Sequence, residues 1–395
     1  MSPVTCNEEK PEFREIPTNP GGTLRPEHVL GRDELIERYW RKLETQSIAL
    51  LAPRRVGKTS ITKRMIAYPP KTFVVHARDL EDLDSVVHFT RALFEDVEAH
   101  LSNFTRFATR GRALLKSLGN LEIKDIKVEL GELSWRRLLD QLFADLDEHA
   151  KTEDRIVVLI WDEFTYFISE LAANGHERDA MALLDSLRAA RQTYTNVRMV
   201  LTGSIGLPEI QRRLRNAGHH NRALNDVADE IVPLFDEANA RKVIAALIRG
   251  ADLKSSATIV DAIVEHSEGH PMMIQLIVEG LKAHERIDEA AVAAEFRKAV
   301  EPPGDPLDLR YYADRIDLNF DEEADLVRAI LDALALEPEQ TLSELLEGLP
   351  SGTSRTQLSN LLRHLIDDFY IVRNGQKHEF RLRFLRDFWI GERGL

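Results

Sequence analysis

The residues with the clearest chemical pattern form the run APRRVGKTS at positions 52–60. Successive backbone N–H groups of such a loop surround a phosphate group, and a helix that begins within it adds partial positive charge. Gly57 lets the backbone approach the phosphate because it has no Cβ atom. The spacing predicts that Lys58 reaches the β- and γ-phosphates of a nucleoside triphosphate and that the Thr59 hydroxyl coordinates Mg²⁺. We expect the following residues to bind the nucleotide: Pro53, Arg54, Arg55, Val56, Gly57, Lys58, Thr59 and Ser60.

Ala52 stands where this loop pattern has its first glycine. Alanine is the mildest replacement for glycine, and the loop keeps its expected context. An apolar run at 46–51 precedes it, and a helical pattern at 59–66 follows it. The alternative is a chance match in a strand–helix turn.

Two adjacent carboxylates, Asp162 and Glu163, follow the apolar run RIVVLIW at 155–161. Runs of this kind suit a strand that is buried on both faces, as in parallel sheets. The end of such a strand lies beside the phosphate loop. We expect Asp162 to hold Mg²⁺, directly or through water, and Glu163 to orient or deprotonate the attacking water. The alternative is a carboxylate that caps a helix.

Ser204 follows the next apolar run, NVRMVL at 196–201. A polar side chain at this strand end is placed to contact the γ-phosphate or the attacking water. We therefore expect a catalytic role for Ser204, and the alternative is an ordinary loop serine.

The elements that position these residues alternate between strand and helix. Strands are expected at 46–51, 71–77, 155–161 and 196–201, with helices between them. This alternation favours an α/β fold with a parallel sheet that is covered on both faces. The run LEIKDIKVEL at 121–130 alternates apolar and charged residues, which predicts a half-exposed strand within an insertion.

The strand signal ends at about residue 236, and helical patterns at 238–247, 256–266 and 272–283 predict a small all-α domain. After the proline-rich break at 302–306, three helices are expected at 322–336, 342–347 and 355–369. Two strands, 370–373 and 379–384, flank Asn374-Gly375, a strong hairpin signal. This is winged-helix order. The expected units are an irregular arm (1–28), a P-loop domain (29–233), a helical domain (234–301), a linker (302–319) and a winged-helix domain (320–395).

Composition and charge restrict the class of protein. A net charge of −14 over 395 residues argues against a general nucleic-acid coat. No run reaches the roughly 18 apolar residues of a transmembrane helix, and the polar N-terminus has no apolar signal-peptide core. The single cysteine, Cys6, excludes an internal disulfide framework. We expect a cytoplasmic protein that makes no membrane contact.

Together these motifs resemble the STAND-type and archaeal-type ATPases of the AAA+ group. The run VLGR at 29–32 looks like their entry motif beside the adenine, and APRRVGKTS looks like their GPRRxGKTS loop. TGSIGL at 202–207 looks like their sensor strand end, and GHP at 269–271 looks like the turn of their helical lid. The resemblance implies binding and hydrolysis of ATP with Mg²⁺, a lid over the base, and nucleotide contacts from Arg32, His270 and Pro271. It often includes a C-terminal winged helix.

No arginine finger stands out in the sequence. Arg212, Arg213 and Arg215 are candidates to contact a neighbouring subunit's nucleotide in a nucleotide-dependent homo-oligomer, and a solvated helix face is the alternative.

Three functions remain open at this point. The first is an ATPase switch whose winged helix contacts an unidentified protein partner or DNA. The second is an ATP-loaded DNA-binding protein, similar to origin-recognition or transposition ATPases, with slow incidental hydrolysis. The third is a scaffold that binds nucleotide permanently. Basic residues in the C-terminal module suit DNA, but acidic neighbours dilute them, and a protein-docking role is equally open. These basic residues are Arg355, Arg363, Arg373, Lys377, Arg381, Arg383 and Arg386.

Overall fold

The computed structural model describes residues 15–100, 127–203, 210, 218, 223–301 and 304–395. Its centre is a parallel five-stranded sheet with the strand order β2-β3-β4-β1-β5. The strands are β1 (Ile48–Leu51), β2 (Phe73–Asp79), β3 (Ile156–Asp162), β4 (Val197–Thr202) and β5 (Ala228–Ile231). Because all five strands run in one direction, their carboxyl ends meet at a single edge of the sheet.

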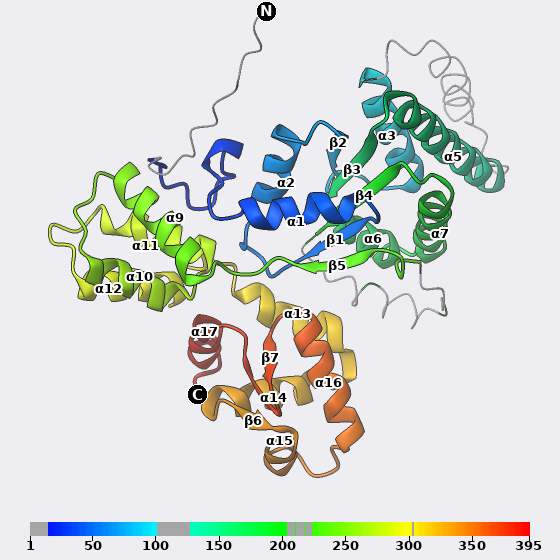
Figure 1. Ribbon diagram of the computed structural model, residues 1–395. Coiled ribbons are helices and arrows are strands. Elements are labelled where there is room, and N and C mark those ends of the chain that lie inside the picture. Colours follow the sequence, from blue (N-terminus) through cyan, green and yellow to red (C-terminus); the bar gives the residue numbers. More distant parts are fainter. Residues whose placement is uncertain (1–14, 101–126, 204–209, 211–217, 219–222, 302–303) are drawn as a thin grey trace, which may run out of the picture.

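Helices cover both faces of this sheet (Figure 1). Successive residues of β3 alternate between the two cores: Val158 and Ile160 pack with α1 and α2, whereas Leu159 and Trp161 pack with the other helices. The helices of the first face are α1 (Asp33–Leu43) and α2 (Lys58–Ala67). Those of the second face are α3 (Val86–His100), α5 (Lys127–Glu153), α6 (Phe164–Ala173) and α7 (Glu177–Thr193). The chain therefore has the α/β fold of a P-loop NTPase, as its sequence predicts.

The sequence analysis missed strand β5. Its four residues, ADEI, include two carboxylates and give no apolar run. The side chain of Glu230 is nevertheless buried, because Arg38 and Lys42 of α1 form ion pairs with it. Because of these ion pairs, an acidic segment can form the edge strand of the sheet, next to β1.

The strand expected at 121–130 is wrong in its described part. Residues 127–130 lie in α5, and residues 121–126 lie outside the described residues. Farther along α5, Leu138, Leu142 and Leu146 are buried at helical spacing. The helical pattern extends upstream to residues 127–130, which are too few to distinguish the period of a helix from that of a strand.

Four helices form a compact unit beside the sheet, the helical unit. They are α9 (Glu237–Gly250), α10 (Ala257–Ser267), α11 (Pro271–Leu281) and α12 (Glu289–Val300). Asp236 and Asp288 cap α9 and α12 by accepting hydrogen bonds from backbone N–H groups. The described part of the N-terminal arm, with the single-turn helix η1 (Pro26–His28), runs along this unit: Ile16 is buried in its core, and the Ile16 N–H donates to the carbonyl oxygen of Ala246.

The C-terminal unit begins at residue 310. Its helices are α13 (Arg310–Phe320), η2 (Asp321–Glu323), α14 (Ala324–Leu336), α15 (Leu342–Gly348), α16 (Arg355–Asp367) and α17 (Arg383–Arg393). Its antiparallel strands are β6 (Gln340–Thr341), β7 (Ile371–Asn374) and β8 (Lys377–Phe380), in the order β6-β8-β7. Helix α13 occupies most of the range expected as a linker. The expected second strand ends at Phe380 rather than 384, because Phe384 belongs to α17.

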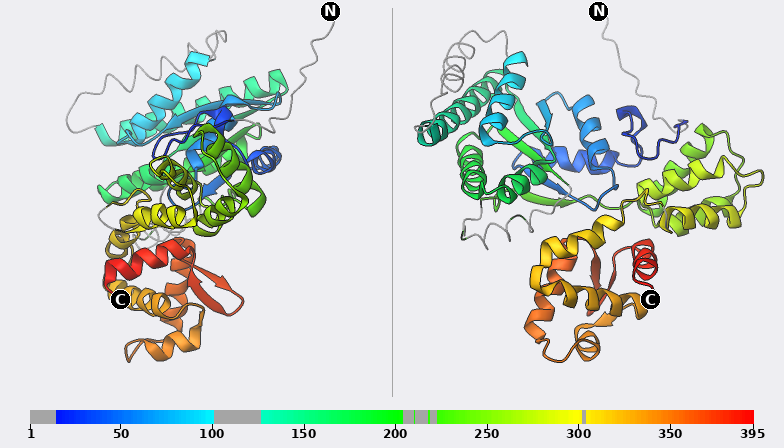
Figure 2. Two further views of the ribbon diagram at one scale, coloured as in Figure 1. Left: turned by 90° about the vertical axis from the view of Figure 1, so that its left-hand side faces the viewer. Right: turned by 180° about the vertical axis from the view of Figure 1, so that it is seen from behind.

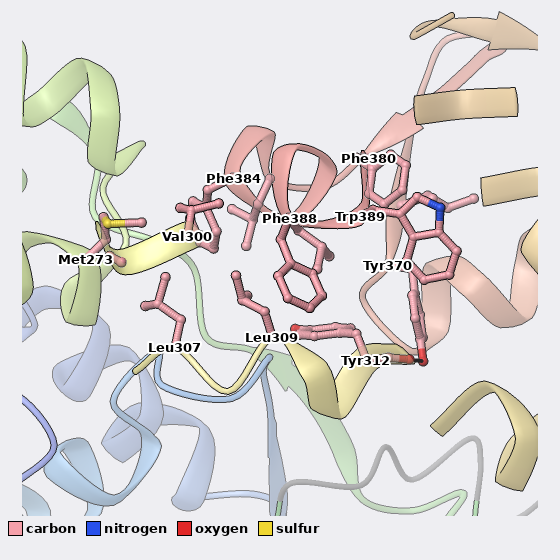
Figure 3. Close-up of a cluster of buried hydrophobic side chains, with 14 of the residues drawn as sticks. Met273, Val300, Leu307, Leu309, Tyr312, Tyr370, Phe380, Phe384, Phe388 and Trp389 are labelled. Atoms are coloured by element: carbon pink, nitrogen blue, oxygen red, sulfur yellow. Dashed lines mark hydrogen bonds between the residues drawn. The ribbon is translucent and has the colours of Figure 1, made fainter. Parts of the chain in front are cut away.

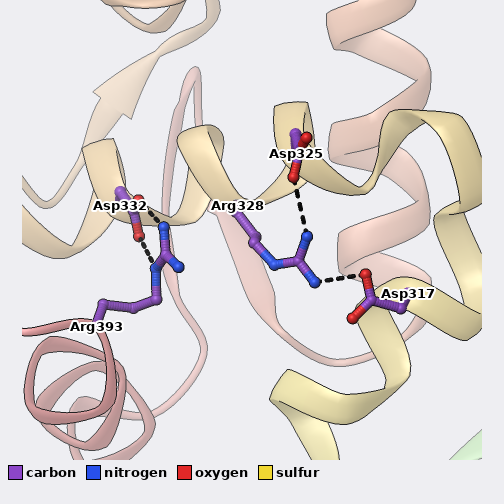
Figure 4. A network of polar contacts seen from close by, with 5 residues as sticks. All are labelled: Asp317, Asp325, Arg328, Asp332 and Arg393. Atoms are coloured by element: carbon purple, nitrogen blue, oxygen red, sulfur yellow. Dashed lines mark hydrogen bonds and ion pairs between the residues drawn. The ribbon is translucent and has the colours of Figure 1, made fainter.

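Helix α17 joins the helical unit to the C-terminal unit. Phe384 and Phe388 lie between Met273 and Val300 on one side and the aromatic pair Tyr312–Tyr370 on the other (Figure 3). These residues belong to one continuous apolar cluster that includes both units. Forked ion pairs add to the C-terminal unit: Arg328 contacts Asp317 and Asp325, and Arg393 contacts Asp332 (Figure 4). Figure 2 (right) shows the helical unit to one side of the sheet and the C-terminal unit below the sheet.

Candidate functional site

The phosphate loop connects the end of β1 to the start of α2, as its sequence context predicts. Gly57 has a φ of 96° and Arg55 a φ of 64°, so two loop residues adopt the left-handed conformation. Alternating backbone conformations of this kind direct N–H groups into an anion-binding hollow. A Cβ atom at Gly57 would meet nothing within 4 Å, but the positive φ itself favours glycine. The backbone therefore forms an open cradle at the start of α2.

Lys58 is the first residue of α2 and is 9% exposed. Its Nζ donates to the carbonyl oxygens of Ala52 at 2.7 Å and Pro53 at 3.3 Å. Burial lowers the pKa of Lys58 to about 8, and the nearby charges of Glu163 and Asp162 oppose that shift. The lysine and the carboxylate pair are thus within electrostatic reach of each other, at the edge where β1 and β3 end.

Asp162 is the last residue of β3 and is held by two donors. The Thr202 hydroxyl donates to its Oδ1, and the backbone N–H of Glu163 donates to the same oxygen at 3.2 Å. Thr202 ends β4, which lies between β3 and β1, so the sheet order brings this hydroxyl to the carboxylate. The sequence analysis gave Thr202 no role of its own.

Glu163 has a φ of 52° and occupies the capping position of α6, but its side chain makes no capping hydrogen bond within the described residues. Its geometry therefore does not match the alternative of a helix-capping carboxylate. Glu163 lines the same cavity as Gly57 and Thr59.

This cavity has a volume of about 640 Å³ and lies between the phosphate loop, the N-terminal arm and the helical unit. The loop residues Pro53 to Ser60 form one wall. The opposite wall includes apolar side chains of Leu24, Phe235 and Met272. A volume of this size is typical of a small-molecule site. The walls suit a ligand that is anionic at one end and apolar at the other.

Arg32 connects the phosphate loop to the segment between β5 and the helical unit. Its guanidinium donates to the carbonyl oxygen of Pro233 at 2.8 Å and to that of Val56 at 3.5 Å. The same group lies 4.0 Å from the centre of the Phe235 ring. Burial lowers the pKa of Arg32 to about 10. Arg32 lines the cavity, and it also fixes the position of the loop relative to the helical unit.

His270 and Pro271 start α11, but only Pro271 is part of the cavity wall. His270 is buried; its Nδ1 accepts from the Met273 N–H at 3.3 Å, and its ring packs edge-on against Phe384 at 5.2 Å. Burial lowers the pKa of His270 to about 4, which keeps the ring neutral at pH 7. The structure therefore places His270 between the helical unit and α17.

The two loop arginines differ in their surroundings. Arg54 forms an ion pair with Asp308, and its guanidinium lies 4.1 Å from the centre of the Tyr311 ring. Arg55 is exposed on the cavity wall and has no ion pair among the described residues. Arg54 thus contacts the segment that starts the C-terminal unit, a contact between positions 254 residues apart.

The remaining predicted residues are placed as follows. Thr59 and Ser60 line the cavity, whereas Val56 is buried in the core beneath the loop and also contributes to the wall. Ser204, Arg212, Arg213 and Arg215 lie outside the described residues. No group of three His, Cys, Asp or Glu side chains able to hold a metal occurs in the described part of the chain. None of the helices described there is long and apolar enough to cross a membrane.

Gln275 of α11 is a cavity residue that the sequence analysis missed. The backbone N–H of Asn19 donates to its Oε1 at 3.0 Å, and both residues line the cavity. The two are 256 positions apart, and no local pattern marks either of them.

No protein-family model and no curated protein matches this chain. Among solved structures, the Walker-type ATPase of Pyrococcus abyssi is similar, with a TM-score of 0.64 and 16% identity over 94% of this chain and 99% of that chain. The ORC2 protein of Aeropyrum pernix, determined with ADPNP and ADP, is similar with a TM-score of 0.53 and 12% identity over 98% and 99% of the two chains. At these identities the likeness concerns the fold, and it is the fold of P-loop ATPases.

Proposed function

We propose that this chain is a Mg²⁺-dependent ATPase of the AAA+ group, of the STAND or archaeal type, that acts as a molecular switch. One observation carries the proposal: Lys58, Asp162 and Glu163 lie close together beside the phosphate loop, at one edge of a parallel sheet. The similar fold of a Walker-type ATPase supports it.

The residues of the site fit a triphosphate with its metal. Within the described residues, the buried Lys58 ammonium donates hydrogen bonds to neutral carbonyl oxygens, and a phosphate oxygen would give it an anionic acceptor. Thr59 and Asp162 would hold Mg²⁺, which typically takes one or two protein oxygens together with phosphate oxygens and water. When bound, Mg²⁺ neutralises charge on the phosphates. Ser204 remains a proposed contact of the γ-phosphate.

Glu163 is the proposed general base. It accepts a proton from a water molecule as the water oxygen attacks the γ-phosphorus, and the bond from that phosphorus to the bridging oxygen breaks. The products are ADP and inorganic phosphate. The left-handed backbone at Glu163 turns the chain out of β3 at the cavity wall, where such a water would lie.

The switch depends on contacts between the phosphate loop and the C-terminal unit. A γ-phosphate competes with Asp308 for the Arg54 guanidinium, and a half-exposed pair of this kind contributes only about 0–1 kcal/mol. His270 against Phe384, and the Glu268 carboxylate that accepts from the Arg383 N–H at 2.8 Å, give the helical unit a second connection to α17. Closing of the helical unit over the nucleotide would therefore move α17.

We further propose the domain division 1–28, 29–233, 234–301, 302–319 and 320–395, with the last unit a winged helix. Its three helices α14, α15 and α16, followed by the β7–β8 hairpin, have that order. The proposed partners are an unidentified protein or DNA, and a homo-oligomer that forms with nucleotide.

A second candidate function is an ATP-loaded DNA-binding protein with slow incidental hydrolysis. The similarity to ORC2 over nearly the whole of both chains favours it. The two candidates differ in turnover: a switch hydrolyses ATP in repeated cycles, whereas the second protein requires ATP for DNA binding and turns it over slowly.

The decisive variant is Glu163→Gln, with Glu170→Gln as a matched control on the exposed side of α6. Loss of a general base typically lowers the rate about 10²–10⁴-fold. We expect steady-state ATP turnover to fall by that factor in Glu163→Gln, while ATP binding is retained and the control is unaffected. Equal turnover in both variants would remove Glu163 from its proposed role.

A further inference from the structure

The described part of the N-terminal arm, residues 15–28, forms part of the wall of the cavity at the phosphate loop. Asn19, Gly22 and Leu24 of the arm line this cavity together with residues 53–60 of the loop. Figure 1 shows the arm, in dark blue, between the helical unit and helix α2. A nucleotide in the cavity would therefore be enclosed by the arm as well as by the phosphate loop.

The first end of the arm is fixed to α9. The Ile16 side chain is 2% exposed in the apolar core of the helical unit, and the Ile16 N–H donates to the carbonyl oxygen of Ala246 at 3.2 Å. Gly250, the last residue of α9, permits this close approach, because a Cβ atom there would lie 2.1 Å from the Ile16 carbonyl oxygen. The φ of Gly250 lies outside the left-handed region, and Gly250 is not among the described residues that line the cavity. Any larger residue at this position would therefore push against the arm alone.

Side chains at the end of α11 add further contacts to the same end of the arm. The backbone N–H of Asn19 donates to the Oε1 of Gln275 at 3.0 Å. The Thr18 hydroxyl donates to the Glu279 carboxylate and accepts from the Lys282 ammonium. These three α11 positions follow one another at helical spacing, so they lie on one face of the helix. The arm is thus attached to two helices of the helical unit.

The second end of the arm is fixed to α2, the helix that begins with Lys58. The Arg64 guanidinium of this helix donates to the carbonyl oxygens of Pro26 at 3.1 Å and Val29 at 2.8 Å. The same guanidinium forms an ion pair with Asp33 of α1 at 2.5 Å. The arm therefore connects the helical unit directly to the helix that carries the lysine of the phosphate loop.

Between its two ends the arm is folded into a turn. The Gly22 N–H donates to the carbonyl oxygen of Asn19 at 3.2 Å, and Gly21 has a φ of 83°. Residues 20–25, which separate the two ends, can extend over at most about 20–22 Å. Because both ends are attached, a movement of the helical unit away from α2 must first straighten this turn and then detach one end.

We infer that the arm is a strap that retains the bound nucleotide, and that it detaches from α9 or from α2 when the nucleotide leaves. The inference rests on the proposed nucleotide binding and assigns the control of nucleotide release to residues 15–28. It does not depend on hydrolysis, so Mg·ADP is a sufficient probe. Because the arm has two attachment sites, weakening either one should speed release.

The test uses the full-length protein and one variant for each end of the arm. Gly250→Ala crowds the attachment to α9, and its matched control is Gly348→Ala, at a helix-terminal glycine where a Cβ atom would meet nothing within 4 Å. Arg64→Gln removes the attachment to α2, and its matched control is Asp33→Asn, which removes the ion pair but leaves Arg64 to hold both carbonyl oxygens. Circular dichroism verifies that the variants fold. Stopped-flow fluorescence then measures the release of Mg²⁺-bound N-methylanthraniloyl-ADP into excess unlabelled ADP.

We expect release at least about fivefold faster in Gly250→Ala, since an added methyl group in a close contact strongly disfavours that contact. Release in Arg64→Gln should be at least about tenfold faster, because two hydrogen bonds from a charged donor are lost. Both controls should release the nucleotide at the rate of the unmodified protein. Amide hydrogen exchange of residues 15–25 without nucleotide should be faster in Gly250→Ala, which reports on the arm independently of the ligand.

The outcomes separate the strap from the nucleotide site. Normal binding with unchanged release in Gly250→Ala and Arg64→Gln would overturn the inference and leave the proposed function intact. No binding of the labelled ADP by the unmodified protein would overturn both.

Discussion

Thr202→Val removes the hydroxyl that holds Asp162 and leaves a side chain of nearly the same shape. Thr202 is 1% exposed and lies beside Leu50 in the sheet, so valine fits a strand position that is already buried. The variant therefore isolates one hydrogen bond to a carboxylate. Asp162 keeps the bond from the Glu163 N–H, so the carboxylate becomes less fixed but is not fully released.

The size of the effect follows from the type of bond. A hydrogen bond to a charged group contributes about 1.5–3 kcal/mol. Each 1.4 kcal/mol is about a tenfold change, so the range corresponds to about tenfold to 150-fold. Because one donor remains on Oδ1, we expect the lower end: about tenfold weaker apparent Mg²⁺ affinity in ATP turnover.

The assay is steady-state turnover as a function of Mg²⁺ concentration at saturating ATP. Thr202→Ser keeps the hydroxyl and should behave like the unmodified protein, which separates the hydrogen bond from general damage to β4. A Thr202→Val protein with an unchanged Mg²⁺ dependence would refute the idea that this hydroxyl positions the metal-holding carboxylate.

Three further predictions concern titration and the contact between units. Burial lowers the pKa of Lys58 from 10.5 to about 8, and a bound phosphate should raise it, so ATP binding at pH 9 should take up a proton. Calorimetry in buffers of different ionisation enthalpy measures this proton uptake. Proton uptake of the same size in Lys58→Met would contradict the assignment to Lys58. His270 has a pKa of about 4 in the folded state and 6.5 in the unfolded chain, so the unfolded state binds more protons between these values. The free energy of unfolding therefore falls as the pH drops through this window, by at most about 3 kcal/mol. Urea unfolding at pH 7 and pH 4.5 should show a smaller loss of stability in His270→Gln, and an equal loss would count against the buried neutral ring. Asp308→Asn should speed amide hydrogen exchange in α13 by up to about fivefold without nucleotide, since a half-exposed ion pair contributes about 0–1 kcal/mol. Asp317→Asn, which removes a different ion pair, should leave hydrogen exchange of the phosphate loop unchanged. Unchanged exchange in Asp308→Asn would show that the Arg54–Asp308 contact does not couple the phosphate loop to the C-terminal unit.

Local patterns in the sequence predicted the central part of the fold. The apolar runs of β1, β3 and β4 are buried on both faces, so their composition alone indicates parallel strands. Strand β5 was missed because Glu230 is stabilised by Arg38 and Lys42 from α1, contacts between positions at least 188 residues apart. Helix α17 was missed because Phe384 was assigned to a strand, although Phe384, Leu385, Phe388 and Trp389 have helical spacing and are buried.

In the candidate site, too, local motifs were predicted from the sequence and contacts between distant segments were not. The motifs indicated Lys58, Asp162 and Glu163, and the parallel sheet brings them to one edge. The contacts of Thr202 with Asp162, of Gln275 with Asn19 and of Arg54 with Asp308 join distant parts of the chain. Pairings of this kind depend on the packing of whole units, so no spacing in the sequence predicts them.

The most direct test of the central claim is a calorimetric titration of the protein with Mg·ATP, alongside Lys58→Met. Convergence of the cradle, the lysine and the carboxylates at one edge predicts saturable binding of one nucleotide per chain, which the lysine variant loses or weakens strongly. No heat of binding in the unmodified protein, or equal affinity in both proteins, would contradict it.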